Sequence, residues 1–169
     1  MMADRLLVGH RKFWGGAMLD QKIDRLKSVP LFAILDDIAL HHIVFNSRSL
    51  TASDGTSLFM EGDASSGAIF LESGELSLLI HSKGEMVERT RLQAGAVVDP
   101  YALITSGKRP VTAKAVGDVK YQLFERSVFR KILENYPGHA ERLQDYLREE
   151  INHTVGTFNG VAARLDFIQ

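Results

Sequence analysis

The stretch VVDPYALITSGKRPVTAKA, residues 97–115, contains the side chains whose types and spacing most clearly suggest chemistry. Asp99 and Pro100 favour a helix start, because aspartate accepts hydrogen bonds from the free amides of a first turn and proline suits the first helical position. Arg109 stands nine residues after Pro100 and could pair with the Asp99 carboxylate. The question is whether this segment binds anions or has stopped binding them.

Other arrangements that could support catalysis or metal binding are not found in the sequence. The six histidines are scattered, and His41 and His42 are neighbours that point about 100° apart on a helix, which prevents them from chelating one metal. Adjacent acidic pairs such as Asp36-Asp37 face water rather than each other. No G-x-S-x-G, P-loop or H-E-x-x-H pattern occurs. We therefore expect no enzyme, no metal site and no resident cofactor.

Composition restricts the class of protein further. The 169 residues suffice for one domain with a core, and the net charge of −1, with lysine and arginine spread along the chain, favours neither nucleic acid nor a membrane surface as partner. The absence of cysteine excludes disulfides and thiolate chemistry. No apolar stretch approaches a spanning helix or a secretory signal. We expect a soluble cytoplasmic protein.

Helical patterns flank the chain at both ends. Residues 1–23 form a leader in which Gly15-Gly16 weakens any helix. Helical periodicity begins at residue 24, and Asp36 is the expected N-cap of a helix over residues 37–44. Near the other end, Ser127 is the expected N-cap of a short helix that includes residues 128–133.

A longer helix is predicted over residues 139–165. Its apolar seam follows a heptad spacing with one polar member: Leu147, Ile151, Thr154, Phe158, Val161 and Leu165. Such a helix needs a partner surface, either its own barrel or a second chain. A homodimer through residues 139–165 is one expectation.

The middle of the chain reads as short strands separated by turns. Predicted strands cover residues 47–51, 56–60, 68–72, 75–81, 86–92, 112–115 and 120–125. Turn residues between them include Gly55, Gly62-Asp63, Ser73-Gly74, Gly84 and Gly117-Asp118. Strands at this spacing indicate an antiparallel barrel or sandwich.

This order of elements, with three local motifs, resembles the cyclic nucleotide-binding domain over residues 26–147. The motifs are LKSVPLFAILDD from Leu26, LFMEGDASSGAIFLESGELSLL over residues 58–79, and RLQAGAVVDPYALITSGKRPVTAKA over residues 91–115. The resemblance implies a mainly β fold with flanking α-helices, an antiparallel β-barrel or jelly roll (double-stranded β-helix). It divides the chain into a leader (1–23), a barrel domain (24–138) and a C-terminal helix (139–169).

The third motif is similar to the family's phosphate-binding cassette. In the family, the amides of a short helix and one arginine bind the cyclic phosphate, and a glutamate accepts from the ribose hydroxyl. The resemblance therefore implies a binding site at Arg109, at Thr112 and at the cassette helix Tyr101-Ala102-Leu103. The ligand implied is cyclic AMP, cyclic GMP or a related anionic small molecule.

The chain departs from the family pattern where the ligand is recognised. Asp99 replaces a glycine, Pro100 replaces the glutamate, and Pro110 after Arg109 has no N–H to donate. We expect the Asp99 carboxylate to act as a built-in anion on the first-turn amides, with Arg109 closing onto it. Alternatively, Asp99 serves as the ribose acceptor and binding survives. Two plainer interpretations are an ordinary Asp99 cap and a solvated Lys108-Arg109 pair.

Three functional hypotheses follow. The first is a non-enzymatic regulatory sensor that binds an anionic small molecule and signals through its C-terminal helices to a partner protein. The second is a degenerate domain that has lost its ligand and serves as a dimerisation or interaction module. The third is a scaffold that docks through Phe13 and Trp14. Only residues 148–169 follow Leu147, so the DNA-binding domain of the family's transcription regulators is not expected.

Overall fold

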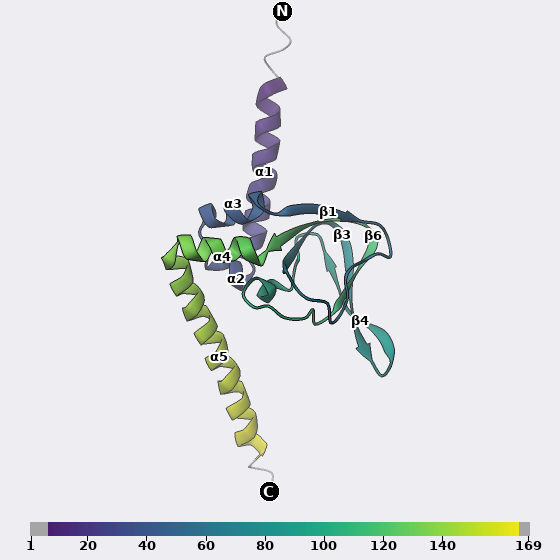
Figure 1. Cartoon of the computed structure of the whole chain (residues 1–169), viewed down its shortest axis with the longest axis vertical. Coiled ribbons are helices and arrows are strands. Elements are labelled where there is room, and N and C mark those ends of the chain that lie inside the picture. Colours follow the sequence, from purple (N-terminus) through teal and green to yellow (C-terminus); the bar gives the residue numbers. More distant parts are fainter. Residues whose placement is uncertain (1–6, 166–169) are drawn as a thin grey trace, which may run out of the picture.

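The computed structural model describes residues 7–165 and the side chains within residues 16–153. An antiparallel sheet lies beside a group of helices, and α1 and α5 extend away from this body in opposite directions (Figure 1). The helical elements are α1 (Leu7–Lys27), α2 (Pro30–Ala33), α3 (Asp37–Phe45), the 3-10 helix η1 (Pro100–Leu103), α4 (Arg126–Asn135) and α5 (Pro137–Leu165). The strands are β1 (Arg48–Ala52), β2 (Ser57–Phe59), β3 (Gly67–Ser82), β4 (Glu85–Gln93), β5 (Val97–Val98) and β6 (Thr112–Glu125).

Two long strands organise the sheet. The hydrogen-bonded order is β1-β6-β3-β4, with β2 paired to β6 and β5 paired to β3, and every pair is antiparallel. Within the described residues β1 does not pair with β4, so the barrel does not close. The predicted fold class, an antiparallel jelly roll with flanking helices, is confirmed.

The prediction of two separate strands is wrong for each of the long strands β3 and β6. Gly74 and Gly117, which the sequence pattern places in turns between strands, have φ of +86° and +72°. Around Gly74 the β3–β6 register shifts, which marks a bulge, and β3 continues to Ser82. Because a Cβ at Gly74 would lie 2.6 Å from the Asp118 carbonyl oxygen, glycine is required where the bulged strand touches β6.

Alternating side chains of the sheet face two apolar clusters. In β3, Phe70 faces the helices and stacks with Phe124 of β6, with ring centroids 6.2 Å apart. Its neighbours Ile69 and Leu71 face the barrel interior. The helix-side cluster includes Leu26, Phe32, Leu40, Ile43, Leu103 and Phe129. The 3-10 helix η1 is therefore anchored to the helices through Leu103.

The helix starts test two capping predictions. Asp36 caps α3, since its Oδ1 accepts from the Ala39 amide at 2.8 Å, which confirms the first prediction. The Ser127 cap was wrong, because α4 begins at Arg126 directly after β6. The Arg126 amide donates to the Ser66 carbonyl at 2.9 Å, and this contact fixes the earlier start.

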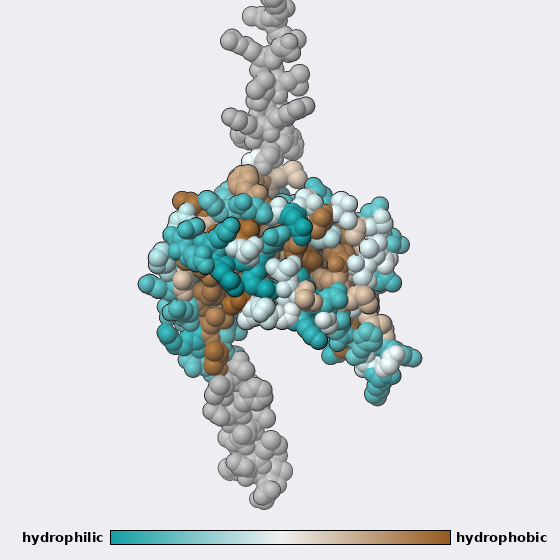
Figure 2. All heavy atoms as spheres, viewed as in Figure 1, coloured by the Kyte–Doolittle hydropathy of each residue, from teal (hydrophilic) through white to brown (hydrophobic). Residues whose placement is uncertain are grey.

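The terminal helices differ from expectation in their starting points. α1 runs unbroken from Leu7 to Lys27 through Gly15-Gly16, across the expected boundary at residue 23, and α5 begins at Pro137. On α5, Leu147 packs beside the helix-side cluster whereas Ile151 is 62% exposed. Figure 2 shows an apolar strip along the described part of α5. The side chains of Thr154, Phe158, Val161 and Leu165, and those of Phe13 and Trp14, lie outside the described residues.

An ion-pair cluster fastens α1 to the sheet. Lys22 pairs with Glu72 of β3 and lies 5.8 Å above the Phe70 ring centroid, and Lys120 lies 3.2 Å from the same carboxylate. Partial burial alone would raise the pKa of the Glu72 carboxyl, but the hydrogen bonds from Lys22 and Lys120 outweigh it and hold this pKa below its ordinary value of 4.5.

We expect Glu72→Gln to lower the free energy of unfolding at pH 7 by about 1–2 kcal/mol. A lowered folded-state pKa stabilises the fold above the ordinary value, and this stabilisation is lost as the pH falls through the lowered pKa. Urea unfolding should therefore show the difference between variant and wild type shrinking between pH 5 and about pH 3. The matched control is Glu134→Gln at an exposed position of α4. A difference that is independent of pH would contradict this assignment.

Candidate functional site

The backbone around Arg109 is held by the turn at Gly62-Asp63. The Gly62 amide donates to the Arg109 carbonyl at 2.9 Å, and the Arg109 amide donates to the Asp63 carbonyl at 2.7 Å. One step further on, the Ser65 amide donates to the Gly107 carbonyl at 2.8 Å. The glycine-aspartate turn that stands out in the sequence thus positions the arginine of the cassette, which we define as residues 99–112.

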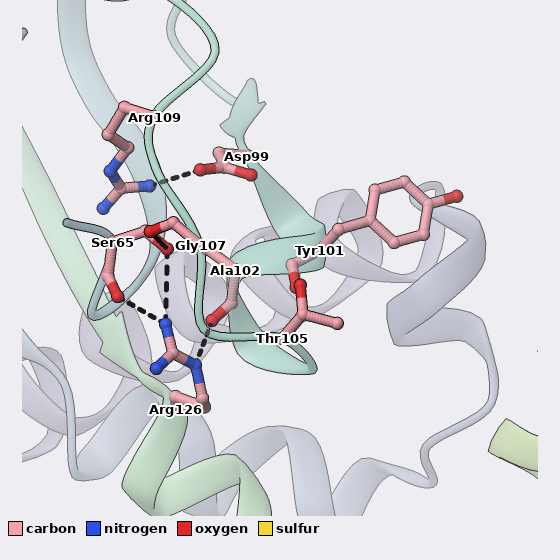
Figure 3. A network of polar contacts seen from close by, with 8 residues as sticks. All are labelled: Ser65, Asp99, Tyr101, Ala102, Thr105, Gly107, Arg109 and Arg126. Carbon is pink, nitrogen blue, oxygen red and sulfur yellow. Dashed lines mark hydrogen bonds and ion pairs between the residues drawn. The ribbon is translucent and has the colours of Figure 1, made fainter. Parts of the chain in front are cut away.

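The Arg109 side chain is buried and paired. It is 5% exposed, and its Nη1 donates to Asp99 Oδ2 at 2.8 Å. Its guanidinium carbon lies 4.4 Å from the centroid of the Phe59 ring, a cation–π contact. The solvated-pair interpretation is therefore wrong for Arg109, and the expected closure of Arg109 onto the Asp99 carboxylate is present in the structure (Figure 3).

Asp99 does not cap the following helix as expected. Its side chain makes no hydrogen bond to the first-turn amides of η1, and its φ and ψ of 52° and 58° lie in the left-handed region. The Asp99 backbone carbonyl instead accepts from the Ala102 amide at 3.2 Å, and the carboxylate is turned toward Arg109. A non-glycine residue in this region costs about 1–2 kcal/mol, which the ion pair offsets. The glycine of the family pattern would occupy this position without strain.

The other predicted site residues divide between the interior and the surface. Thr112 is buried, and its Oγ1 accepts from the Glu61 amide at 2.9 Å. Ala102 and Leu103 are buried in η1. Tyr101 is 46% exposed and points away from Arg109 (Figure 3). The structure thus brings Arg109 and Asp99 together, whereas Tyr101 belongs to a different contact.

That contact joins the cassette to α5. The hydroxyl groups of Tyr101 and Tyr146 are 2.8 Å apart. Burial and the hydrogen bond with Tyr101 raise the pKa of the Tyr146 hydroxyl above its ordinary value, so this phenol stays protonated at neutral pH. The hydroxyl pair is a polar link between the cassette and the C-terminal helices.

A second link is Arg126, which the sequence did not single out. Its Nε donates to the Ala102 carbonyl at 2.7 Å, and its Nη2 donates to the Ser65 carbonyl and lies 3.3 Å from Ser65 Oγ. The Ser65 hydroxyl in turn donates to the Gly107 carbonyl at 3.1 Å. Arg126, the first residue of α4, therefore holds both η1 and the loop that precedes Arg109 (Figure 3).

Comparison with known proteins assigns the family. The sequence model of the cyclic nucleotide-binding domain matches residues 50–136, just over half of the chain. The chain belongs to this family, whose members act as regulatory domains. In the described part of the chain, no helix is long and apolar enough to cross a bilayer, and no group of three or more acidic or histidine side chains is placed to hold a metal ion.

The chain is similar to parts of proteins of several kinds, and it spans less than a third of the length of the curated relatives it matches. The N-terminal domain of a transcriptional regulator from Streptomyces coelicolor superimposes with a TM-score of 0.71 at 23% identity, covering 79% of this chain and 94% of that one. The regulatory domain of Toxoplasma gondii PKA, crystallised with cAMP, gives a TM-score of 0.63 at 23% identity, with coverage of 69% and 44%. Lysophospholipase nte1 of Neosartorya fischeri is 28% identical over 109 residues, which are 64% of this chain and 7% of the enzyme.

Proposed function

We propose that this chain is a non-enzymatic regulatory module in which the Asp99 carboxylate takes the place of an anionic ligand at Arg109. The observation that carries the proposal is the 2.8 Å ion pair between these groups. Arg109 is only 5% exposed in this pair. A free anion would have to displace a carboxylate that is already tethered beside the guanidinium. Pro100 and Pro110 further reduce the contacts available to a nucleotide.

A module of this kind acts through its helices. Arg126 and Tyr146 hold neighbouring residues of η1, so the docked cassette and the C-terminal helices stabilise each other. The exposed Ile151 supports a role for residues 139–165 in binding a second copy or a partner protein in the cytoplasm. The net charge of −1 favours neither nucleic acid nor a membrane as that partner.

A second candidate function is a sensor of cyclic AMP, cyclic GMP or a related anionic small molecule. It is favoured by Arg109, which keeps the family's position and is buried within the cassette. In this case the ligand would replace the Asp99 carboxylate, and signalling would be a population shift between two helix arrangements.

Native mass spectrometry of the full chain, purified from cells that make cyclic nucleotides, tests the proposal. We expect a dimer with no bound nucleotide. A copurified cyclic nucleotide at stoichiometric occupancy would favour the sensor. A monomer without nucleotide would agree with the Asp99–Arg109 pairing and contradict the proposed dimer.

A further inference from the structure

A polar groove lies beside the start of α4, next to Arg126. Its volume is about 360 Å³, and it is lined by Ser65, Ser66, Glu125, Arg126, Ser127 and Arg130. This volume is at the lower end of the range for ligand-binding sites and suits a small ion. Of the residues drawn in Figure 3, Arg109 and the groove residue Arg126 lie on opposite sides of the Ser65–Gly107 contact.

The groove is cationic. Two guanidinium groups line it, and its one carboxylate, Glu125, lies 3.0 Å from Arg48 Nε and is thereby neutralised. Among the described residues, Arg130 makes no ion pair. Arg126 uses Nε and Nη2 for Ala102 and Ser65, and within the same part of the chain its Nη1 makes no hydrogen bond.

We propose that this groove binds a small free oxyanion of the phosphate or sulfate class. The planar fork of arginine matches such an ion through paired, charge-assisted hydrogen bonds, and the hydroxyl of the exposed Ser66 is a further donor, whereas the Ser127 hydroxyl donates to Glu125 Oε2 at 3.4 Å. A metal cation is disfavoured by the two guanidinium groups. The inference does not depend on the function proposed for Asp99.

The position of Arg126 gives this site a specific consequence. The same guanidinium holds the Ala102 carbonyl at 2.7 Å, so an ion on its outer edge polarises or competes for the bond to η1. Oxyanion binding should therefore change the environment of the Ala102–Leu103 peptide as well as that of Ser66 and Ser127. An ion bound loosely to surface charge has no such effect on the buried residues Ala102 and Leu103.

Titration of inorganic phosphate into the ¹⁵N-labelled full chain, at constant ionic strength, tests the proposal. We expect saturable amide shifts at Ser66, Ser127 and Leu103. Arg130→Gln should weaken phosphate binding about tenfold, because it removes one charged donor. Arg130→Lys should weaken it less. The matched control is Arg148→Gln at an exposed position of α5, which should leave the affinity unchanged.

The outcomes separate this site from the Arg109 site. Asp99→Gly exposes Arg109 to anions and should leave the affinity measured at Ser66 and Ser127 unchanged. Shifts that grow linearly without saturation, or equal affinities in wild type and Arg130→Gln, would overturn the proposal. Tighter phosphate binding measured at Ser66 and Ser127 in Asp99→Gly, with Arg130→Gln unaffected, would overturn it too, by assigning the bound phosphate to the cassette.

Discussion

Arg109→Ala is expected to lower the free energy of unfolding by about 3–5 kcal/mol. The substitution removes the partner of the Asp99 carboxylate, whose side chain is only 15% exposed, and leaves a void beside the Phe59 ring. Asp99 also keeps its left-handed backbone conformation in this variant, without the ion pair that offsets the cost of that conformation. Urea unfolding at neutral pH measures the effect.

A double-mutant cycle isolates the pair from the void. We expect the loss in Asp99→Gly/Arg109→Ala to be smaller than the sum of the two single losses, because the second substitution removes a charge that the first left unpaired. The matched control is Arg91→Ala, whose exposed pairs with Glu75 and Glu88 should contribute less than about 1 kcal/mol. Strictly additive losses at Arg109 and Asp99 would mean that the contact stabilises nothing.

Arg126→Met is expected to have the second largest effect, about 3 kcal/mol. The variant keeps much of the side-chain volume but leaves the carbonyls of Ala102 and Ser65 without their charged donor. Hydrogen exchange should show that the loss of protection is concentrated in the cassette. The Ile104 amide, which donates to Tyr101 at 2.9 Å, should exchange about tenfold faster or more.

The control for Arg126 is Lys131→Met, an exposed position further along α4 and outside the groove. It should change neither the stability nor the exchange of the Ile104 amide by a comparable amount. If Arg126→Met destabilises the whole domain while the cassette exchanges no faster relative to the sheet, Arg126 supports α4 rather than the cassette.

Local signals in the sequence were sufficient where the contact itself is local. The Asp36 cap spans three residues, so the aspartate before an apolar helical pattern predicts it directly. The turn at Gly62-Asp63 was equally clear. By contrast, Gly74 and Gly117 allow positive φ in turns and in bulges alike, and only the neighbouring strand shows which one forms.

The candidate site was predictable in its partners but not in its geometry. Asp99 and Arg109 are close enough in sequence for their pairing to be inferred. The left-handed backbone conformation of Asp99 depends on tertiary contacts. The pairing of Val98 with Ile69 in β3 fixes the direction from which the chain reaches Pro100. Arg126 was missed because its contacts reach residues 24 and 61 positions away, and no local pattern marks them.

Calorimetric titration of cyclic AMP and cyclic GMP into wild type and Asp99→Gly tests the central claim most directly. The variant frees Arg109 and restores the residue that the left-handed backbone prefers, so it should bind at least about tenfold more tightly than wild type. Adding Arg109→Ala to the variant should abolish that gain. Micromolar binding by wild type that is lost in Asp99→Gly would show instead that Asp99 contacts the ligand, and would contradict a carboxylate standing in for it.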